Sequence, residues 1–197
     1  MIRAVFFDFY GVWTPDVFAQ YLQLAEQYGT EVAGPLNVLV SKYFHGMSTP
    51  EEVANTFRFK LSRPEIDAAE FTLNENSISP ALIDFMRSLH GHFLKLGVLA
   101  NLGTQEYALL SGLNNRYQLF EVIAGPLPFT IGEPLLSQSV FAMALQQIGE
   151  PPRNCLVVSG NPAYRQFAAS LGMTALPFEG FPRLRESLEQ LLANDVA

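Results

Sequence analysis

The run Ile2-Arg3-Ala4-Val5-Phe6-Phe7-Asp8-Phe9, followed by Tyr10-Gly11, decides the fold class of this 197-residue chain. A short apolar run with β-branched and aromatic residues predicts a strand buried on both faces, as in parallel sheets covered by helices. Asp8 ends this strand, where an ionised carboxylate is costly unless it is exposed or hydrogen-bonded. Asp8 is therefore a candidate functional residue, and capping of loop amides is the alternative reading.

Similar apolar runs recur later in the chain. Further strands are expected at Leu94 to Ala100, Asn154 to Ser159 and Met173 to Phe178, with an edge strand at Phe120 to Ala124. Helical periodicities lie between them, at Val140 to Ile148, Leu184 to Leu192 and from Pro80 onward. Strands that alternate with helices predict right-handed crossovers and an α/β fold with a doubly wound parallel sheet.

Residues 15 to 77 break this alternation, because they contain helical patterns only. Thr49 and Glu52 form a capping-box signature before one of these helices. We therefore expect an α/β core of residues 1–14 and 78–197, with residues 15–77 inserted as a helical cap. Such a cap would lie over the carboxyl ends of the strands, where open α/β sheets bind ligands.

Composition excludes several classes of function. The chain has 12 Lys and Arg against 19 Asp and Glu, for a net charge of −7, which disfavours non-specific binding to nucleic acid. No apolar run approaches the roughly 20 residues that span a bilayer, and Asp8 interrupts the N-terminal stretch, so no membrane segment or signal peptide is expected. A single cysteine, Cys155, favours a cytoplasmic protein.

Four segments together resemble the haloacid dehalogenase superfamily over essentially the whole chain. They are Val5 to Val12 (motif one), Gly97 to Asn101 (motif two), the approach to the helix Ser137 to Ile148 (motif three) and Cys155 to Asn161 (motif four). The resemblance implies a Rossmann-like core with a cap, a small-molecule substrate, and Asp8 as a covalent nucleophile.

The sequence departs from the phosphatases of that superfamily at their functional positions. Tyr10 replaces the second Asp, Ala100 the phosphate-binding hydroxyl, and Gly160 the magnesium-binding Asp. The motif-three Lys falls at Glu133 or Leu135. One carboxylate with neutral oxygens is a poor ligand set for Mg²⁺, so we expect no metal and no cofactor unless the altered site still binds Mg²⁺.

One branch, the L-2-haloacid dehalogenases, uses Asp-x-Tyr-Gly without a metal, and motif four is also similar to theirs. This resemblance implies a catalytic set of Asp8, Tyr10, Asn101, Ser159 and Asn161. The substrate-binding set is expected to be Gly11, Trp13, Lys42, Ala100 and Phe141. Phe141 would stand where the branch has an active-site Tyr, and Lys42 would present a cation from the cap; a solvated helix face is the alternative for Lys42. For Trp13 the alternative is a hydrophobic hinge between cap and core.

Three functions remain open at this stage, and whether the chain is an enzyme is left undecided. The first is a hydrolase-family protein with Asp8 as nucleophile, metal-independent and weakly active or inactive. The second is a catalytically silent module, a pseudoenzyme retained for binding or assembly, including assembly as a homo-oligomer. The third is a small-ligand binding protein that uses the pocket between cap and core without turnover.

Overall fold

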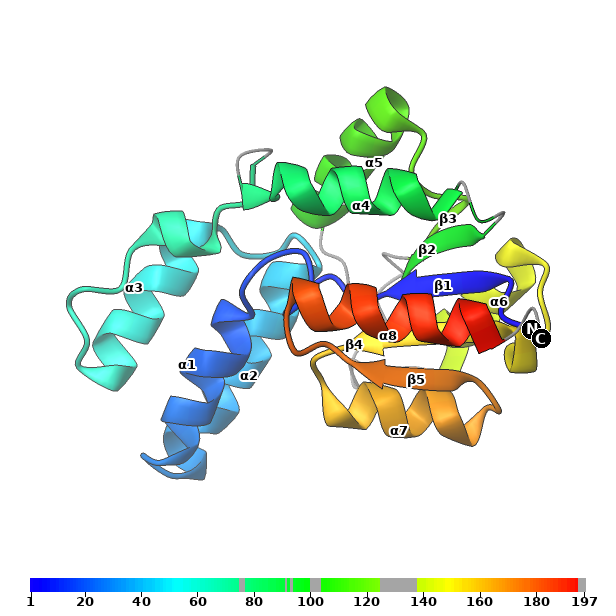
Figure 1. Ribbon diagram of the computed structural model, residues 1–197. Helices are drawn as coiled ribbons and strands as arrows, with labels where there is room; N and C mark the ends of the chain where they lie inside the picture. The colour runs from blue at the N-terminus through cyan, green and yellow to red at the C-terminus, as the bar shows by residue number, and fades with distance from the viewer. Residues whose placement is uncertain (75–76, 91, 93, 100–103, 125–137, 195–197) are drawn as a thin grey trace.

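A computed structural model describes residues 1–74, 77–90, 92, 94–99, 104–124 and 138–194 (Figure 1). One sheet of five parallel strands has the order β3-β2-β1-β4-β5. The strands are β1 (Ala4–Phe7), β2 (Lys95–Leu99), β3 (Val122–Ala124), β4 (Cys155–Ser159) and β5 (Thr174–Pro177). The expected doubly wound parallel sheet is confirmed, with β3 at an edge as expected.

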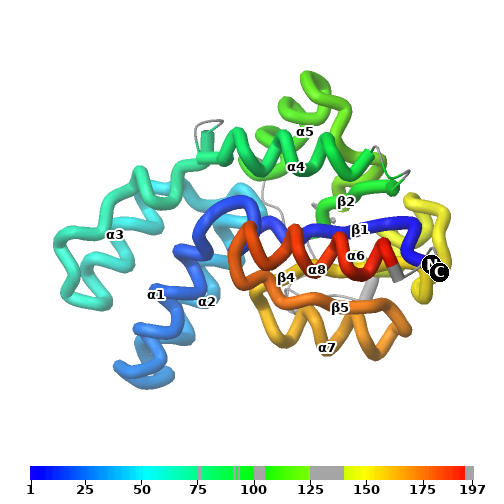
Figure 2. Tube along the Cα trace, in the orientation of Figure 1, coloured from blue at the N-terminus to red at the C-terminus, as the bar shows by residue number. Residues whose placement is uncertain are grey.

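Helices cover both faces of the sheet (Figures 1 and 2). One face packs against α4 (Pro80–His90), α5 (Thr104–Tyr117) and α8 (Phe181–Asn194), and the other against α6 (Gln138–Ile148) and α7 (Pro162–Ser170). A short 3-10 turn, η3 (Pro152–Asn154), leads into β4. Alternate side chains of β1 lie on opposite faces of the sheet. Val5 and Phe7 pack in the hydrophobic cluster with α4, α5 and α8, and Ala4 and Phe6 pack in the cluster with α6 and α7. The central strand is therefore fully buried, as its unbroken apolar run predicts.

The segment between β1 and α4 contains helices only within the described residues. These inserted helices are α1 (Val17–Glu26), α2 (Thr30–Phe44), α3 (Pro50–Leu61) and the 3-10 helix η1 (Ala68–Phe71). They bury a cluster of their own, in which the rings of Phe18, Phe57 and Phe71 take part. The predicted capping box of Thr49 and Glu52 opens α3, with both of its hydrogen bonds formed.

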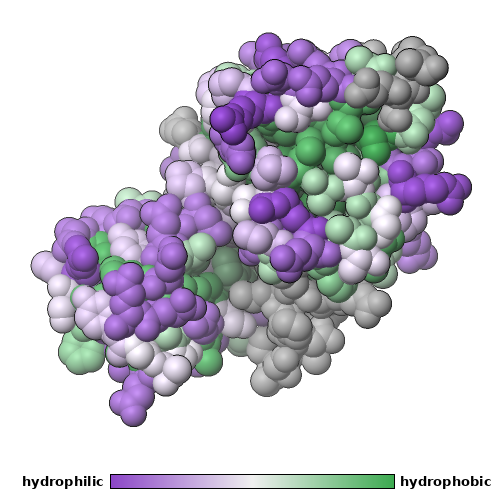
Figure 3. Space-filling view, turned by 60° about the horizontal axis from the view of Figure 1, so that its bottom comes forward, coloured by the Kyte–Doolittle hydropathy of each residue, from purple (hydrophilic) through white to green (hydrophobic). Residues whose placement is uncertain are grey.

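The inserted helices lie beyond the carboxyl end of β1, toward which its arrowhead points in Figure 1. In the space-filling view they form the smaller lobe at the left of the molecule (Figure 3). The division into two domains stays a prediction, since a separate hydrophobic cluster alone does not define a domain. In the described part of the chain, no helix combines the length and the apolar character needed to cross a membrane.

Candidate active site

The register of the central strands brings Asp8 and Ser159 together. Phe7 lies level with Val158 of β4, so Asp8, the residue after β1, lies beside Ser159, the last residue of β4. The Asp8 backbone N–H donates to the Val158 carbonyl at 2.9 Å, and the Ser159 hydroxyl donates to Asp8 Oδ2 at 2.6 Å. The Asn161 backbone N–H in turn donates to Ser159 Oγ at 3.0 Å. Motifs one and four therefore meet at this edge of the sheet.

Burial controls the charge of Asp8, whose exposed fraction is 5%. Loss of hydration raises the pKa of Asp8 from 3.8 to about 7, and the neighbouring Asp16 carboxylate raises it further. Hydrogen bonds from Ser159 and from the Phe9 backbone act in the opposite direction. At neutral pH, Asp8 is therefore divided between its ionised and protonated forms.

Tyr10 connects the turn after Asp8 to α5 and to the inserted helices. The turn depends on Gly11, whose φ of +80° suits a residue without a Cβ. The Tyr10 hydroxyl donates to Glu106 Oε1 at 2.5 Å, and its ring contacts Phe18 and Phe44 edge-on. Burial, followed by the charge of Glu106, raises the pKa of Tyr10 well above its usual value. Tyr10 thus acts as a neutral hydrogen-bond donor to a buried carboxylate.

Trp13 and Phe141 lie in the two hydrophobic clusters of the core. The Trp13 ring packs against Phe120 with centroids 5.3 Å apart, which fits the alternative of a hydrophobic hinge. The Phe141 ring packs against Phe167 with centroids 5.0 Å apart on the opposite face of the sheet. Core packing accounts for both positions, and their contact with a substrate stays a prediction.

The other expected site residues are distributed more widely. Asn161 is exposed and caps α7, where its side chain accepts from the Ala163 backbone N–H at 2.9 Å. Lys42 is exposed on α2, in keeping with a solvated helix face. Ala100 and Asn101 lie outside the described residues, as do Glu133 and Leu135.

Three charged residues that the sequence did not single out surround the site. Glu106 is completely buried under Tyr10, and Asp16 caps α1 by accepting from the Ala19 backbone N–H at 2.9 Å. Arg165 donates to the carbonyl of Ser159 at 2.8 Å. Asp16 carried a readable signal, because an Asp before an apolar helical pattern is a typical N-cap. Glu106 and Arg165 look like ordinary helix-surface residues in the sequence.

The described residues around Asp8 do not fit a magnesium ion. Asp8 supplies a carboxylate that is already hydrogen-bonded to Ser159, while Gly160 offers no side-chain ligand. Among the described residues, no three His, Cys, Asp or Glu side chains are grouped so as to hold a metal. Mg²⁺ requires near-octahedral ligation by hard oxygen atoms, which this set does not supply.

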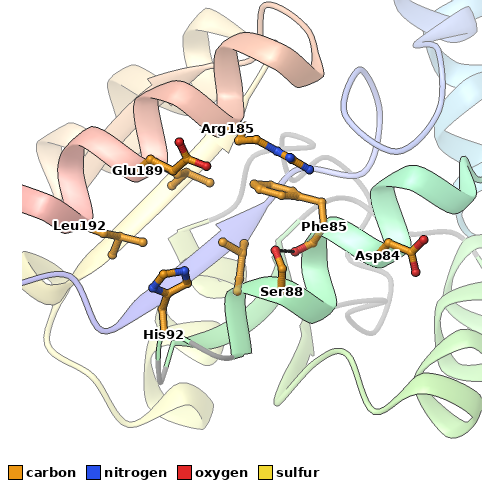
Figure 4. A pocket seen from close by; sticks show the side chains of 9 residues that line it. Asp84, Phe85, Ser88, His92, Arg185, Glu189 and Leu192 are labelled. Atoms are coloured by element: carbon orange, nitrogen blue, oxygen red, sulfur yellow. Dashed lines mark hydrogen bonds between the residues drawn. The ribbon is translucent and has the colours of Figure 1, made fainter.

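A pocket of about 340 Å³ lies away from Asp8, between α4 and α8 (Figure 4). Its floor is apolar, with Phe85, Leu89 and Leu188, and Arg185 extends over the Phe85 ring. Glu189 and Asp84 add two carboxylates to the lining. With two carboxylates and one guanidinium, the lining is mixed in charge and does not identify a ligand.

Comparison with known proteins shows a likeness in structure without one in sequence. No family model matches the chain, and no curated protein does. β-Phosphoglucomutase from Clostridium difficile matches with a TM-score of 0.56 and 20% identity, over 100% of this chain and 99% of that one. A HAD-family enzyme from Bacteroides thetaiotaomicron, in complex with magnesium and inorganic phosphate, matches with a TM-score of 0.56 and 15% identity over 93% and 99%.

A third similar structure is the L-2-haloacid dehalogenase from Xanthobacter autotrophicus with chloropropionic acid covalently bound. It matches with a TM-score of 0.51 and 15% identity, over 89% of this chain and 76% of that one. At these identities the likeness concerns the fold alone. The chain thus has the Rossmann-like α/β fold of haloacid dehalogenase superfamily enzymes.

Proposed function

We propose that this chain is a metal-independent hydrolase of low turnover in which Asp8 is the covalent nucleophile. The observation that supports this most directly is the 2.6 Å hydrogen bond from Ser159 to Asp8 at the carboxyl end of the central strand. It orients a buried carboxylate at the edge where open α/β sheets bind ligands. The dehalogenase from Xanthobacter autotrophicus, whose structure holds its ligand covalently, has the same fold.

The proposed reaction has two steps. A carboxylate oxygen of Asp8 attacks a carbon that bears a leaving group; a C–O bond forms, the bond to the leaving group breaks, and that group departs with its electron pair. Water then attacks the carbonyl carbon of the new ester. The product leaves as an alcohol, one proton is released, and the Asp8 carboxylate is regenerated.

Two features of the site support low turnover. At neutral pH a large fraction of Asp8 is protonated, because burial raises its pKa to about 7, and a protonated carboxyl is a poor nucleophile. In addition, the charged side chain that acts on the pKa of Asp8 is Asp16, whose carboxylate carries the same negative charge as ionised Asp8. Preorganised groups that stabilise the negative charge developing on the leaving group usually contribute much of the catalysis. A second carboxylate at the site repels this charge instead.

A single-turnover experiment in heavy-oxygen water tests the nucleophile. If Asp8 forms an ester, water attacks Asp8, so the first product molecule carries an ordinary oxygen from the carboxylate and the heavy oxygen enters Asp8. Asp8→Asn should abolish the reaction, whereas EDTA should leave the rate unchanged. Heavy oxygen in the first product would show that water attacks the substrate directly and would contradict the proposal.

A silent binding module is the second candidate, and one observation favours it. Asp8 is buried, and two residues further on Tyr10 is held by Glu106, Phe18 and Phe44, which leaves Asp8 little exposed to a substrate. A module of this kind would form no ester with any electrophile. Intact mass spectrometry after exposure to reactive alkyl halides separates the two functions, because even a very slow hydrolase would accumulate the ester.

A further inference from the structure

Arg165 lies on α7 at a position that is unfavourable for a cation unless a contact compensates it. The helix begins at Pro162, so Arg165 belongs to its first turn, where the positive end of the helix dipole repels a positive charge. Its Nη1 donates to the Ser159 carbonyl at 2.8 Å, and in the described part of the chain it forms no ion pair. The bond to Ser159 therefore accounts for the placement of the guanidinium.

The carbonyl that Arg165 binds belongs to the peptide between Ser159 and Gly160. Gly160 has a negative φ, and a Cβ there would meet no atom within 4 Å, so neither strain nor packing requires a glycine. The glycine instead frees this peptide from the steric limits that a Cβ imposes. The Phe178 backbone N–H donates to the same carbonyl at 3.2 Å, a longer bond than that from Arg165. The charge-assisted bond from Arg165 is thus the stronger restraint on the peptide plane.

This peptide plane is coupled to Asp8 through Asn161. The Asn161 backbone N–H donates to Ser159 Oγ at 3.0 Å, and the Ser159 hydroxyl donates to Asp8 Oδ2 at 2.6 Å. The Arg165 backbone N–H donates to the Asn161 carbonyl at 3.2 Å, so the main chain and the side chain of Arg165 both close this turn. A rotation of the peptide would displace the Asn161 N–H, and the Ser159 hydroxyl would lose the donor that sets its direction.

We infer that Arg165 is a positioning residue, which fixes the peptide between Ser159 and Gly160 so that the Ser159 hydroxyl points at Asp8. This inference rests on the proposed nucleophilic role of Asp8 and adds a residue that acts on it through Ser159. The restraint is geometric, because the guanidinium bonds to the Ser159 carbonyl and the Ser159 hydroxyl bonds to the carboxylate.

Arg165→Met tests the inference, because methionine replaces the apolar stem of the side chain and has no donor. The variant should raise the pKa of Asp8 by roughly half a pH unit, in the direction expected when the bond from Ser159 weakens. Carbon-13 NMR titration of the Asp8 carboxyl measures this shift. Arg165→Lys keeps a cationic donor and should recover at least about half of it. Arg165→Gln, whose amide ends short of the Nη1 position, should behave like Arg165→Met and replaces it if that variant does not fold.

The reaction of Asp8 with bromoacetamide gives a second readout. An Asp8 oxygen forms a C–O bond, the C–Br bond breaks and bromide leaves with its electron pair. All chains carry Cys155→Ala, so that the single thiol does not react. Below the pKa, the ionised fraction falls about tenfold per pH unit, so at about pH 6 Arg165→Met should form the ester about threefold more slowly. Peptide mapping measures the rate.

Arg58→Met is the matched control, since Arg58 also donates to a main-chain carbonyl, that of Ile66 in the inserted segment. It should leave the pKa of Asp8 and the rate of ester formation unchanged. Salt separates geometry from charge. A shift caused by the lost charge of Arg165 would shrink between about 0.05 M and about 0.5 M salt, whereas a shift caused by a lost restraint would not.

The inference and the proposed function fail in different ways. A constant pKa of Asp8 in Arg165→Met and Arg165→Gln would overturn the inference, while bromoacetamide would still modify Asp8. A shift that high salt removes, that Arg165→Lys does not reduce, or that Arg58→Met reproduces would also overturn it. No modification of Asp8 in the chain with native Arg165 would overturn the proposed function itself, and the inference with it.

Discussion

Ser159 and Asp8 stand 151 positions apart in the sequence, yet the Ser159 hydroxyl donates to Asp8 Oδ2 at 2.6 Å and both residues are buried. The hydrogen bond lowers the pKa of Asp8, against the larger effect of burial that raises it to about 7. Ser159 therefore orients the Asp8 carboxyl group and also increases its ionised fraction.

Replacing Ser159 with Ala should raise the pKa of Asp8 above about 7, because the bond that favours the carboxylate is lost. Carbon-13 NMR titration of the Asp8 carboxyl measures this shift directly. The alkylation of Asp8 should move to higher pH by the same amount. Ser88→Ala is a suitable control, because Ser88 donates to the Phe85 carbonyl within α4, away from Asp8. A pKa that stays constant in Ser159→Ala would contradict the role given to the hydroxyl.

Asp8→Asn should stabilise the fold at alkaline pH. Folding raises the pKa of Asp8 from 3.8 to about 7, so between these two pH values the folded chain binds more protons than the unfolded chain. The free energy of unfolding therefore falls as the pH rises through this range. Above about pH 7, the folded wild-type chain carries a buried negative charge at Asp8, which the Asn variant does not carry. Between about pH 5.5 and about pH 8, the advantage of the variant should grow by about 2 kcal/mol, at about 1.36 kcal/mol per pKa unit.

Urea unfolding at the two pH values measures this difference. Asp84→Asn, at an exposed position on α4, should show almost no pH-dependent gain. An equal gain for both variants would mean that general relief of negative charge, and not the burial of Asp8, controls stability in this range.

Tyr10→Phe should destabilise the chain by about 1–3 kcal/mol, the usual cost of removing a hydrogen-bond donor to a buried polar group. The loss arises because Glu106, which has no exposed surface, no longer accepts the Tyr10 hydroxyl. Tyr21→Phe offers a matched comparison, since Tyr21 donates to Glu70 at 2.8 Å in an exposed position. That variant should change the free energy of unfolding by no more than about 0.5 kcal/mol. Equal losses in thermal or urea unfolding would show that burial of Glu106 is not the cause.

Gly97→Ala should disturb the centre of the sheet. A Cβ at this position would lie 2.6 and 2.7 Å from ring atoms of Phe6, which is itself fully buried in β1. Overpacking of this kind typically costs about 1–3 kcal/mol. Gly112→Ala meets no atom within 4 Å on α5 and should instead stabilise by roughly 0.5–1 kcal/mol. Calorimetric melting of both variants checks the two opposite signs.

The sheet could be predicted from sequence because its signals are local. Short, mainly apolar runs followed by a polar residue or Gly marked β1, β2 and β4, and the capping box marked α3. The helix α5 carried no such signal. Its sequence TQEYALLSGLNNRY contains Gly112 and two adjacent Asn residues, which are weak helix formers, and its formation depends on packing of Leu110 and Leu113 in the core.

The site was harder to predict than the fold for a related reason. Glu106 belongs to the helix that the sequence did not reveal, so its pairing with Tyr10 could not be foreseen. Trp13 was placed in the site because it closely follows Asp8, and Phe141 by resemblance, whereas a buried aromatic residue has the same sequence signature in a core as in a pocket. Asp8 was identifiable because a carboxylate at the end of a buried strand conflicts with its surroundings.

The order of the strands has a consequence for how the protein is made. β1 is the middle strand, and the partner that completes the site, β4, is translated about 150 positions later. At roughly 5–20 residues per second, the ribosome needs on the order of ten seconds to supply it. During this time the run Ala4–Phe7 has no β4 to pair with, which exposes the nascent chain to aggregation and to capture by chaperones. Asp8 is thus translated well before Ser159, the residue that holds its carboxylate in the folded chain.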